Sequence, residues 1–153
     1  MENKKVSEKY LAFRLGNEMY AVDANSVIAI DRIKKVTRIP MAPPFVKGVV
    51  ELRGMMVPLV DLRMRFSLPE QEATRETCVM FVSGKHSSVG VIVDAVLESK
   101  TFISDQISSP PNLSQKENPF VVGLHSSSGG EVSIIVDLTL VIGLEEQNSE
   151  ISA

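Results

Sequence analysis

Short apolar runs separated by glycine-containing turns occur along most of the chain, and they predict a series of β-hairpins. The clearest pair is formed by residues 49–53 and 57–60, with Arg53-Gly54 as the turn between them. Glycine readily adopts the positive φ that a tight hairpin turn requires. Asp61 follows the second run at a position suited to the N-cap of a short helix. This stretch therefore predicts a hairpin that leads directly into a helical turn.

The chain contains this unit twice. Gly48 precedes Asp61 by 13 positions, and Gly123 precedes Asp137 by 14. The second unit predicts strands at residues 120–125 and 132–136 and a short helix at residues 138–142, with Gly143 as its C-terminal cap. An internal repeat of this kind predicts two similar substructures related by approximate two-fold symmetry.

An earlier hairpin is repeated as well. Residues 10–15 and 19–22 flank a Gly-Asn turn, and residues 77–82 and 89–93 flank a polar turn at 83–88. The remaining pattern predicts a short helical piece at 24–30, strands at 36–39 and 96–103, and a long polar loop at 104–119.

The repeated units predict an all-β protein of about ten short strands, arranged as two pseudo-symmetric five-stranded β-barrels with short helices. A barrel of roughly 70 residues has a marginal core by itself, so we expect the two barrels to share one. We assign residues 10–144 to a single domain, with one barrel at about 10–66 and the other at about 76–144. The polar segment 67–75 is the predicted join, residues 1–9 a flexible tail and residues 145–153 an acidic tail.

Composition suits one compact domain of 153 residues, 44% hydrophobic and 23% charged. A single cysteine, Cys78, excludes an internal disulfide and a multi-cysteine metal site. No apolar leader or membrane-length apolar run is present, so we expect a soluble cytoplasmic protein. Residues 1–66 hold 12 Lys/Arg and 7 Asp/Glu, a net +5, whereas residues 67–153 hold 4 and 12, a net −8. This polarity suits partner orientation or head-to-tail association, and it equally suits two solvated charged faces.

The sequence contains no persuasive catalytic constellation. His86 and His125 fall in predicted Ser/Gly-rich hairpin loops and are interpreted as solvated turn histidines, while Cys78 lies in an apolar strand. Four aspartates follow apolar strands and are interpreted as helix or turn caps: Asp23, Asp61, Asp94 and Asp137. We therefore predict no enzymatic activity, no cofactor and no metal site.

A basic cluster is the feature that most favours nucleic-acid binding; it comprises Arg32, Lys34, Lys35, Arg38 and Lys47. Single-stranded nucleic acids are usually held by aromatic side chains that stack on the bases. Only 5% of the residues are aromatic and none is Trp, which argues against this function. A protein-binding surface is favoured instead, because Met55 and Met56 directly follow the predicted hairpin turn and methionine is adaptable at binding surfaces.

The combined motifs resemble the CheW-like chemotaxis coupling (adaptor) family over roughly residues 10–144. They are Val-Thr-Arg-Ile at 36–39, Pro-Phe-Val-Lys-Gly-Val at 44–49, Leu-Arg-Gly at 52–54 and Val-Pro-Leu-Val-Asp-Leu-Arg at 57–63, with further matches at 20–23, 89–94 and 135–138. The resemblance implies two SH3-like barrels around a shared core. It also implies a non-enzymatic adaptor between chemoreceptor (methyl-accepting) cytoplasmic hairpin tips and the regulatory domain of a CheA-type histidine kinase.

The same resemblance implies a location in membrane-associated receptor arrays without direct membrane insertion, no nucleic-acid partner, and CheW-like paralogues as further partners. Its candidate binding residues for receptor or kinase are Val27, Val36, Glu51, Arg53, Gly54, Met55, Met56, Thr77, Cys78 and Val79. Many family members carry Asn at the position of Glu51 and Glu at the position of Ala29. These departures leave open a parallel chemosensory pathway, such as one controlling pili or gliding, and a small nucleic-acid- or ligand-binding barrel remains the other alternative.

Overall fold

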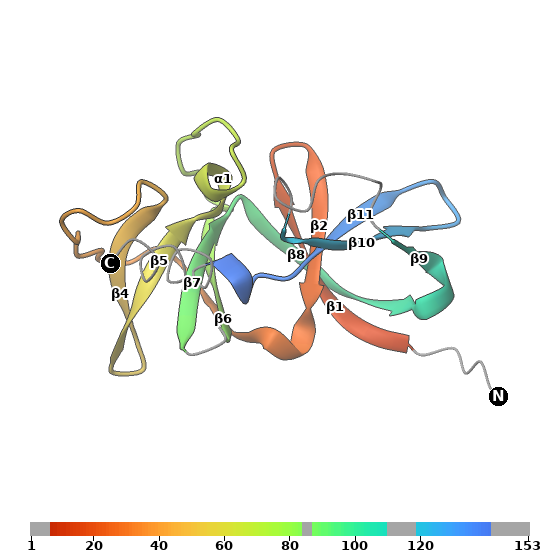
Figure 1. Ribbon diagram of the computed structural model, residues 1–153, viewed down its shortest axis with the longest axis horizontal. Coiled ribbons are helices and arrows are strands. Elements are labelled where there is room, and N and C mark those ends of the chain that lie inside the picture. Colours follow the sequence, from red (N-terminus) through yellow and green to blue (C-terminus); the bar gives the residue numbers. More distant parts are fainter. Residues whose placement is uncertain (1–6, 84–86, 110–118, 142–153) are drawn as a thin grey trace.

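Two β-sheets, which we call barrel A and barrel B, lie side by side in the computed structural model, which describes residues 7–83, 87–109 and 119–141 (Figure 1). Barrel A has the strand order β8-β1-β2-β11-β10-β9. Its strands are β1 (Ser7–Leu15), β2 (Glu18–Asp23), β8 (Ala95–Ile103), β9 (Ile107–Ser108), β10 (Val121–Ser126) and β11 (Val132–Val136), and the 3-10 helix η2 (Ser104–Gln106) joins β8 to β9.

Barrel B has the strand order β3-β6-β7-β5-β4. Its strands are β3 (Val27–Asp31), β4 (Val46–Leu52), β5 (Met55–Asp61), β6 (Cys78–Ser83) and β7 (Ser88–Val93). The 3-10 helix η1 (Ala24–Ser26) leads into β3, and the short helix α1 (Leu62–Arg65) follows β5.

The two barrels have the same architecture. Reading β8-β1-β2-β11-β10 against β3-β6-β7-β5-β4 matches five strands of each barrel and leaves β9 of barrel A unmatched. The parallel pairs, β2 with β11 and β7 with β5, fall at the same place. Strands β4 and β10 each contain a bulge at the equivalent position, next to Gly48 in β4 and next to Gly123 in β10. The predicted all-β fold of two pseudo-symmetric barrels is therefore confirmed.

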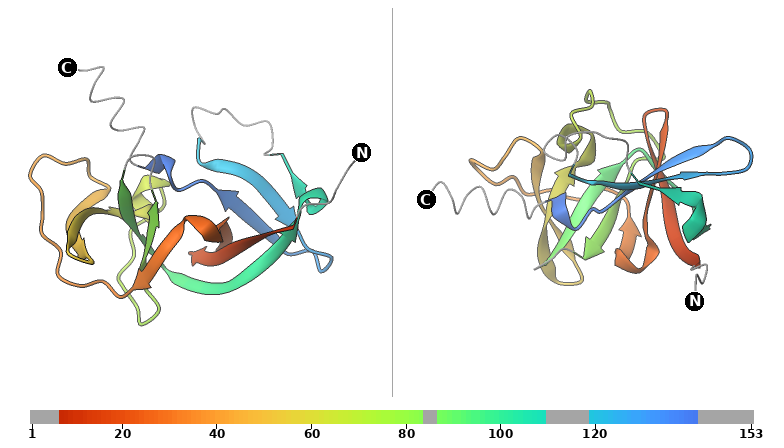
Figure 2. Two further views of the ribbon diagram at one scale, coloured as in Figure 1. Left: turned by 90° about the horizontal axis from the view of Figure 1, so that it is seen from below. Right: turned by 45° about the vertical axis from the view of Figure 1, so that its right-hand side comes forward.

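The assignment of one barrel to each half of the sequence is wrong. Barrel B takes its strands from residues 27–93, whereas barrel A combines residues 7–23 with residues 95–136. Each repeat places its first hairpin in one barrel and its remaining strands in the other, and β8 leads from the junction along barrel A (Figure 2). Periodicity indicates which face of a strand is buried, but it does not indicate which strand lies beside it. The predicted join at 67–75 instead connects α1 to β6 within barrel B.

The helical piece predicted at 24–30 is also wrong. The Asp23 carboxylate accepts a hydrogen bond from the Asn25 backbone N–H, but the 3-10 helix ends after three residues. The chain then extends as β3 and pairs with β6. Isoleucine and valine dominate this stretch, and their branched side chains favour the pleated surface of a sheet over a helix.

Other predicted boundaries change in detail. The strand at 36–39 is reduced to one bridge, between Thr37 and Val49. The long polar loop begins with η2 and β9, and β1 starts at Ser7, within the predicted tail. The second helical turn starts as predicted, with the Val141 N–H donating to the Leu138 carbonyl at 3.2 Å. Residues 84–86, 110–118 and 142–153, which include parts of predicted loops, Gly143 and the acidic tail, lie outside the described residues.

Three hydrophobic clusters stabilise the fold. The largest lies between the barrels and contains buried residues from both, such as Phe13 and Tyr20 of barrel A and Met80 and Val91 of barrel B. A second cluster fills barrel B around Val50, Val57, Leu59, Val79 and Phe81. A third fills barrel A around Tyr10, Ala21, Phe102 and Ile135. The shared cluster explains why neither barrel should be stable without the other.

Candidate functional site

Five of the candidate binding residues lie together on the β4–β5 hairpin. Leu52 pairs with Met55, so Arg53 and Gly54 form a two-residue turn, with φ of 51° and 82°. Positive φ at both positions is the hallmark of a type I′ turn, which matches the twist of the flanking strands. Met55 and Met56 are 63% and 57% exposed, and Glu51 is also exposed. We call these residues, Glu51 and Arg53 to Met56, the hairpin tip.

A second surface lies where the two barrels meet. An open cavity of about 400 Å³ is bordered by the end of β3, the start of β6 and the start of β8. Ile30, Arg32, Thr77, Cys78 and Val96 are among its lining residues. We call this cavity the junction groove. It contains two of the candidate residues, Thr77 and Cys78, and an exposed apolar side chain, Ile30, that is not among the candidates.

Three other candidates lie elsewhere. Val27 is half-buried at the other end of β3 and packs against the shared core, and Val36 packs against the interior of barrel B. Val79 is only 1% exposed and belongs to the core of barrel B, so its selection as a contact residue is wrong. The predicted strand is present as β6, but because successive side chains of a strand point to opposite faces, Val79 lies inside the barrel while Cys78 lines the groove.

Charged side chains surround the junction groove. Arg32 donates to the Arg75 carbonyl at 2.9 Å, and Arg14 of β1 forms an ion pair with Glu76 at 3.2 Å. A hydrogen bond from Lys34 holds the pKa of Asp31 below its usual value, and the Arg32 backbone N–H acts in the same direction. Burial raises the pKa of the Cys78 thiol, which therefore stays protonated near neutral pH and is a poor nucleophile.

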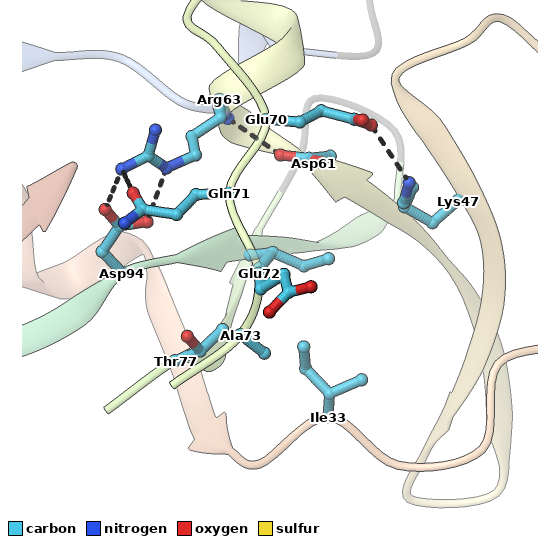
Figure 3. Close-up of a pocket in the computed structure, with 11 residues that line it drawn as sticks. Ile33, Lys47, Asp61, Arg63, Glu70, Gln71, Glu72, Ala73, Thr77 and Asp94 are labelled. Atoms are coloured by element: carbon cyan, nitrogen blue, oxygen red, sulfur yellow. Dashed lines mark hydrogen bonds and ion pairs between the residues drawn. The ribbon is translucent and has the colours of Figure 1, made fainter. Parts of the chain in front are cut away.

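A polar pocket of about 390 Å³ lies on barrel B beside the segment that follows α1 (Figure 3). Arg63 lies at one end of it and binds Asp94, with Nε 2.9 Å from Oδ1 and Nη2 on Oδ2. Arg63 also donates to the Pro69 carbonyl at 2.8 Å and to the Gln71 side chain. Lys47 and Glu70 face each other across the other side of the pocket at 3.8 Å.

The Arg63–Asp94 pair links elements that are distant in the sequence. Asp94 lies between β7 of barrel B and β8 of barrel A, and it accepts a hydrogen bond from the Gly16 N–H in the β1–β2 turn at 2.7 Å. Asp94 therefore does not cap a helix or turn that follows its own strand, as was predicted, but binds Arg63 and a turn distant in the sequence. The equivalent roles of Asp23, Asp61 and Asp137 as caps are confirmed. Asp94 differs from these three because a strand, not a helical turn, follows it, and that difference was a signal in the sequence.

The interpretation of His125 as a solvated turn residue is also wrong. His125 lies in β10, is 7% exposed and stacks on Phe102 inside barrel A. His86 lies outside the described residues. Across the described part of the chain, no group of three or more His, Cys, Asp or Glu side chains is placed to hold a metal ion. The same part of the chain contains no helix long and apolar enough to cross a membrane.

Two symmetric barrels with an exposed hairpin tip and a groove at their junction define a double-barrel interaction module. The family model of the CheW-like domain matches residues 9–146 of this chain. Chemotaxis protein CheW of Bacillus subtilis is 31% identical over 147 residues, covering 96% of this chain and 94% of that protein. Its counterpart in Klebsiella aerogenes is 32% identical over 147 residues, covering 95% and 88%.

The crystal structure of the scaffolding protein TtCheW from Thermoanaerobacter tengcongensis is similar in fold, with a TM-score of 0.83 and 28% identity. The match covers 90% of this chain and 93% of TtCheW. The chain belongs to the CheW-like domain family. The resemblance stated from the sequence motifs, and the SH3-like double-barrel fold that it implied, are thereby confirmed.

Proposed function

We propose that the protein is a non-enzymatic adaptor that couples the cytoplasmic tips of chemoreceptors to a CheA-type histidine kinase in chemotaxis. The observation that carries the proposal is family membership over nearly the whole chain, together with relatives named as chemotaxis proteins. In this proposal the protein is cytoplasmic and is recruited to receptor arrays at the membrane. It transmits a signal only if its contacts differ between receptor states, because a bridge with equal affinity for both states shifts no equilibrium.

The hairpin tip is the contact surface that we propose for coupling. Arg53 occupies a backbone conformation with φ of 51°, which Asn, Asp and Gly adopt more easily than arginine. A costly backbone conformation at an exposed turn points to a requirement for the side chain itself. Arg53 is exposed and is followed, after Gly54, by two exposed methionines, a combination of charge and adaptable apolar surface that suits a protein partner.

Thr77 and Cys78 are proposed as a second contact region in the junction groove, and Val27, at the other end of β3, stays a separate candidate. The groove offers apolar surface from Ile30 and Val96 together with the charges of Asp31 and Arg32. Such a surface suits an amphipathic helix, whose apolar face would lie in the groove while its polar residues meet the charged rim.

A pull-down with purified components tests the proposal. The full chain is tested for binding to the regulatory domain of a CheA-type kinase, to a receptor hairpin tip, and to both together. We expect binding to each partner. Binding to neither under conditions in which a known CheW binds both would refute the adaptor function.

The role of Arg53 is tested in reconstituted receptor–kinase arrays. We expect Arg53→Ala and Arg53→Asn each to weaken coupling, while Arg53→Lys retains part of it. Arg53→Asn is the informative variant, because asparagine tolerates positive φ and should keep the turn intact. Arg38→Asn is the matched control, since Arg38 is another exposed arginine on barrel B. Wild-type coupling by Arg53→Asn would show that the side chain is not required.

A further inference from the structure

The interior of barrel A contains a histidine that the proposed adaptor function does not use. The His125 ring lies 3.7 Å from the Phe102 ring, centroid to centroid, with an angle of 8° between the planes. Its Nε2 is 3.3 Å from Oε1 of Gln106 in η2. Ser133, directly opposite His125 on β11, is 3% exposed. A titratable ring is thus enclosed beside the apolar cluster of Tyr10, Ala21, Phe102 and Ile135.

The internal symmetry shows what this position holds in the other barrel. His125 lies two residues after Gly123 and pairs with Ser133; Val50 lies two residues after Gly48 and pairs with Val57. Val50 and Val57 are both core residues of barrel B. One fold, used twice in the same chain, therefore has an apolar pair in one interior and a His–Ser pair in the other. The architecture does not require the histidine.

Burial and one nearby cation disfavour protonation of His125. Burial lowers the pKa of His125, and the cationic Lys100 on β8 acts in the same direction. Lys100 itself is 3.5 Å from Glu131 at the turn before β11. Tyr10 of β1 also stacks on Phe102, and Asp105 precedes Gln106 in η2. A buried imidazolium would lose its hydration and lie near the Lys100 cation, and stacking on Phe102 offsets only part of this cost, so hydration is the favourable response to protonation.

We infer that His125 is a proton-operated latch in barrel A, and that its protonation releases the η2–β9 segment from the sheet. The β9 strand has two residues and, among the described residues, pairs with Leu124 and His125 of β10. It is the shortest strand of the barrel and directly contacts the latch residue. Lifting η2 and β9 hydrates the imidazolium without breaking the longer β10–β11 ladder, so this edge should open first. The inference does not depend on the adaptor function.

The sign of the effect follows from linkage. Because the folded pKa lies below the unfolded value of about 6.5, the closed state is fully stabilised above that pH and loses stability as pH falls below it. One proton is taken up per opening event. The opening constant should therefore rise by up to about tenfold for each pH unit below about 6.5, until the folded pKa is reached.

Hydrogen exchange followed by NMR between pH 7.5 and 5 tests the latch. The readouts are the His125 imidazole titration and the protection factors of the β9 and β10 amides, corrected for intrinsic exchange. The Thr37 and Val49 amides of barrel B, which bond to each other's carbonyls at 3.0 and 2.8 Å, are the internal reference. A His86→Gln variant assigns the histidine signals. The His125→Val/Ser133→Val variant recreates the apolar pair of barrel B.

We expect His125 to titrate below about pH 6.5. The protection factors of the β9 and β10 amides should fall over the same pH range, while those of the reference amides do not change. The double variant should abolish this pH dependence. Titration of His125 at or above about 6.5, or equal loss of protection in both barrels, would overturn the inference. So would an unchanged pH dependence in the double variant. If the double variant does not fold, the titration and exchange of the wild-type chain still decide the matter.

Discussion

Replacing Asp94 by asparagine should destabilise the protein substantially, because it removes the charge that faces Arg63 across a mostly buried contact. The Arg63 and Asp94 side chains are only 11% and 19% exposed. Asparagine keeps the shape of the side chain and an oxygen that can accept from the Gly16 N–H, so the substitution isolates the loss of charge. The Arg63 guanidinium would then remain near the protein interior without its counter-ion.

The magnitude follows from this burial. Removing one partner of a fully buried ion pair costs about 3–5 kcal/mol. The residual solvent contact of Asp94 reduces the cost, and we expect about 2–3 kcal/mol for Asp94→Asn. For a chain of this length, a loss of that size corresponds to a fall in Tm of about 5–10 °C.

Urea and thermal unfolding measure the effect, and the exposed pair Arg14–Glu76 is the matched control. The Arg14 and Glu76 side chains are 37% and 67% exposed, so Glu76→Gln should cost about 0.5 kcal/mol or less. In a double-mutant cycle, Arg63→Met combined with Asp94→Asn should cost less than the sum of the single changes by about 1–3 kcal/mol. Additive effects, or an Asp94→Asn variant as stable as Glu76→Gln, would refute the reasoning.

The pH dependence provides a second readout. The Arg63 guanidinium holds the pKa of Asp94 below its usual value; burial opposes this effect and the Gly16 N–H reinforces it. A depressed folded pKa contributes stability above the unfolded value of about 3.9, and that stability is lost as pH falls through the folded pKa. The difference in stability between wild type and Asp94→Asn should therefore be constant from about pH 5 to 7 and should decrease in more acidic solution.

Two further predictions concern packing. Gly48→Ala should cost about 3 kcal/mol or more, because the new Cβ would lie 2.2 Å from the Thr37 carbonyl oxygen at a φ of +145°. Gly123→Ala should cost about 1 kcal/mol by overpacking, since its nearest contact is a side-chain methyl of Ile107 at 3.0 Å; equal urea midpoints for the two variants would contradict the close-approach argument. Met80→Ala should cost about 2–5 kcal/mol, and probes in both barrels should report one shared transition because Met80 lies in the core between them. Separate transitions would show that the barrels unfold independently.

Much of the local structure was predictable because hairpins have short-range signals. Alternating apolar residues and a glycine turn specify the β4–β5 hairpin whatever surrounds it, and the repeat predicted its counterpart, β10–β11. The helix prediction for residues 24–30 failed because a short apolar run has no clear period. The pairing of β3 with β6 decided the conformation of this segment.

The candidate site was predictable to a different extent. The hairpin tip consists of neighbours in sequence, so five candidates were brought together by one turn. The junction groove takes residues from β3, β6 and β8, and no local pattern indicates that these strands meet. Ile30 and Val96 were missed for that reason, and Val79 was selected although it belongs to the core.

The sequence alone determined the all-β class, the duplication, most hairpins and the family, because each depends on residues close together in the chain or on a motif order that folding does not alter. Tertiary structure decided which hairpin joined which barrel, so that barrel B interrupts barrel A in the chain. It also paired Arg63 with Asp94 and placed His125 against Phe102. Strand pairing, charge pairing and burial all depend on contacts between residues far apart in sequence, and those contacts exist only once the two barrels have packed together.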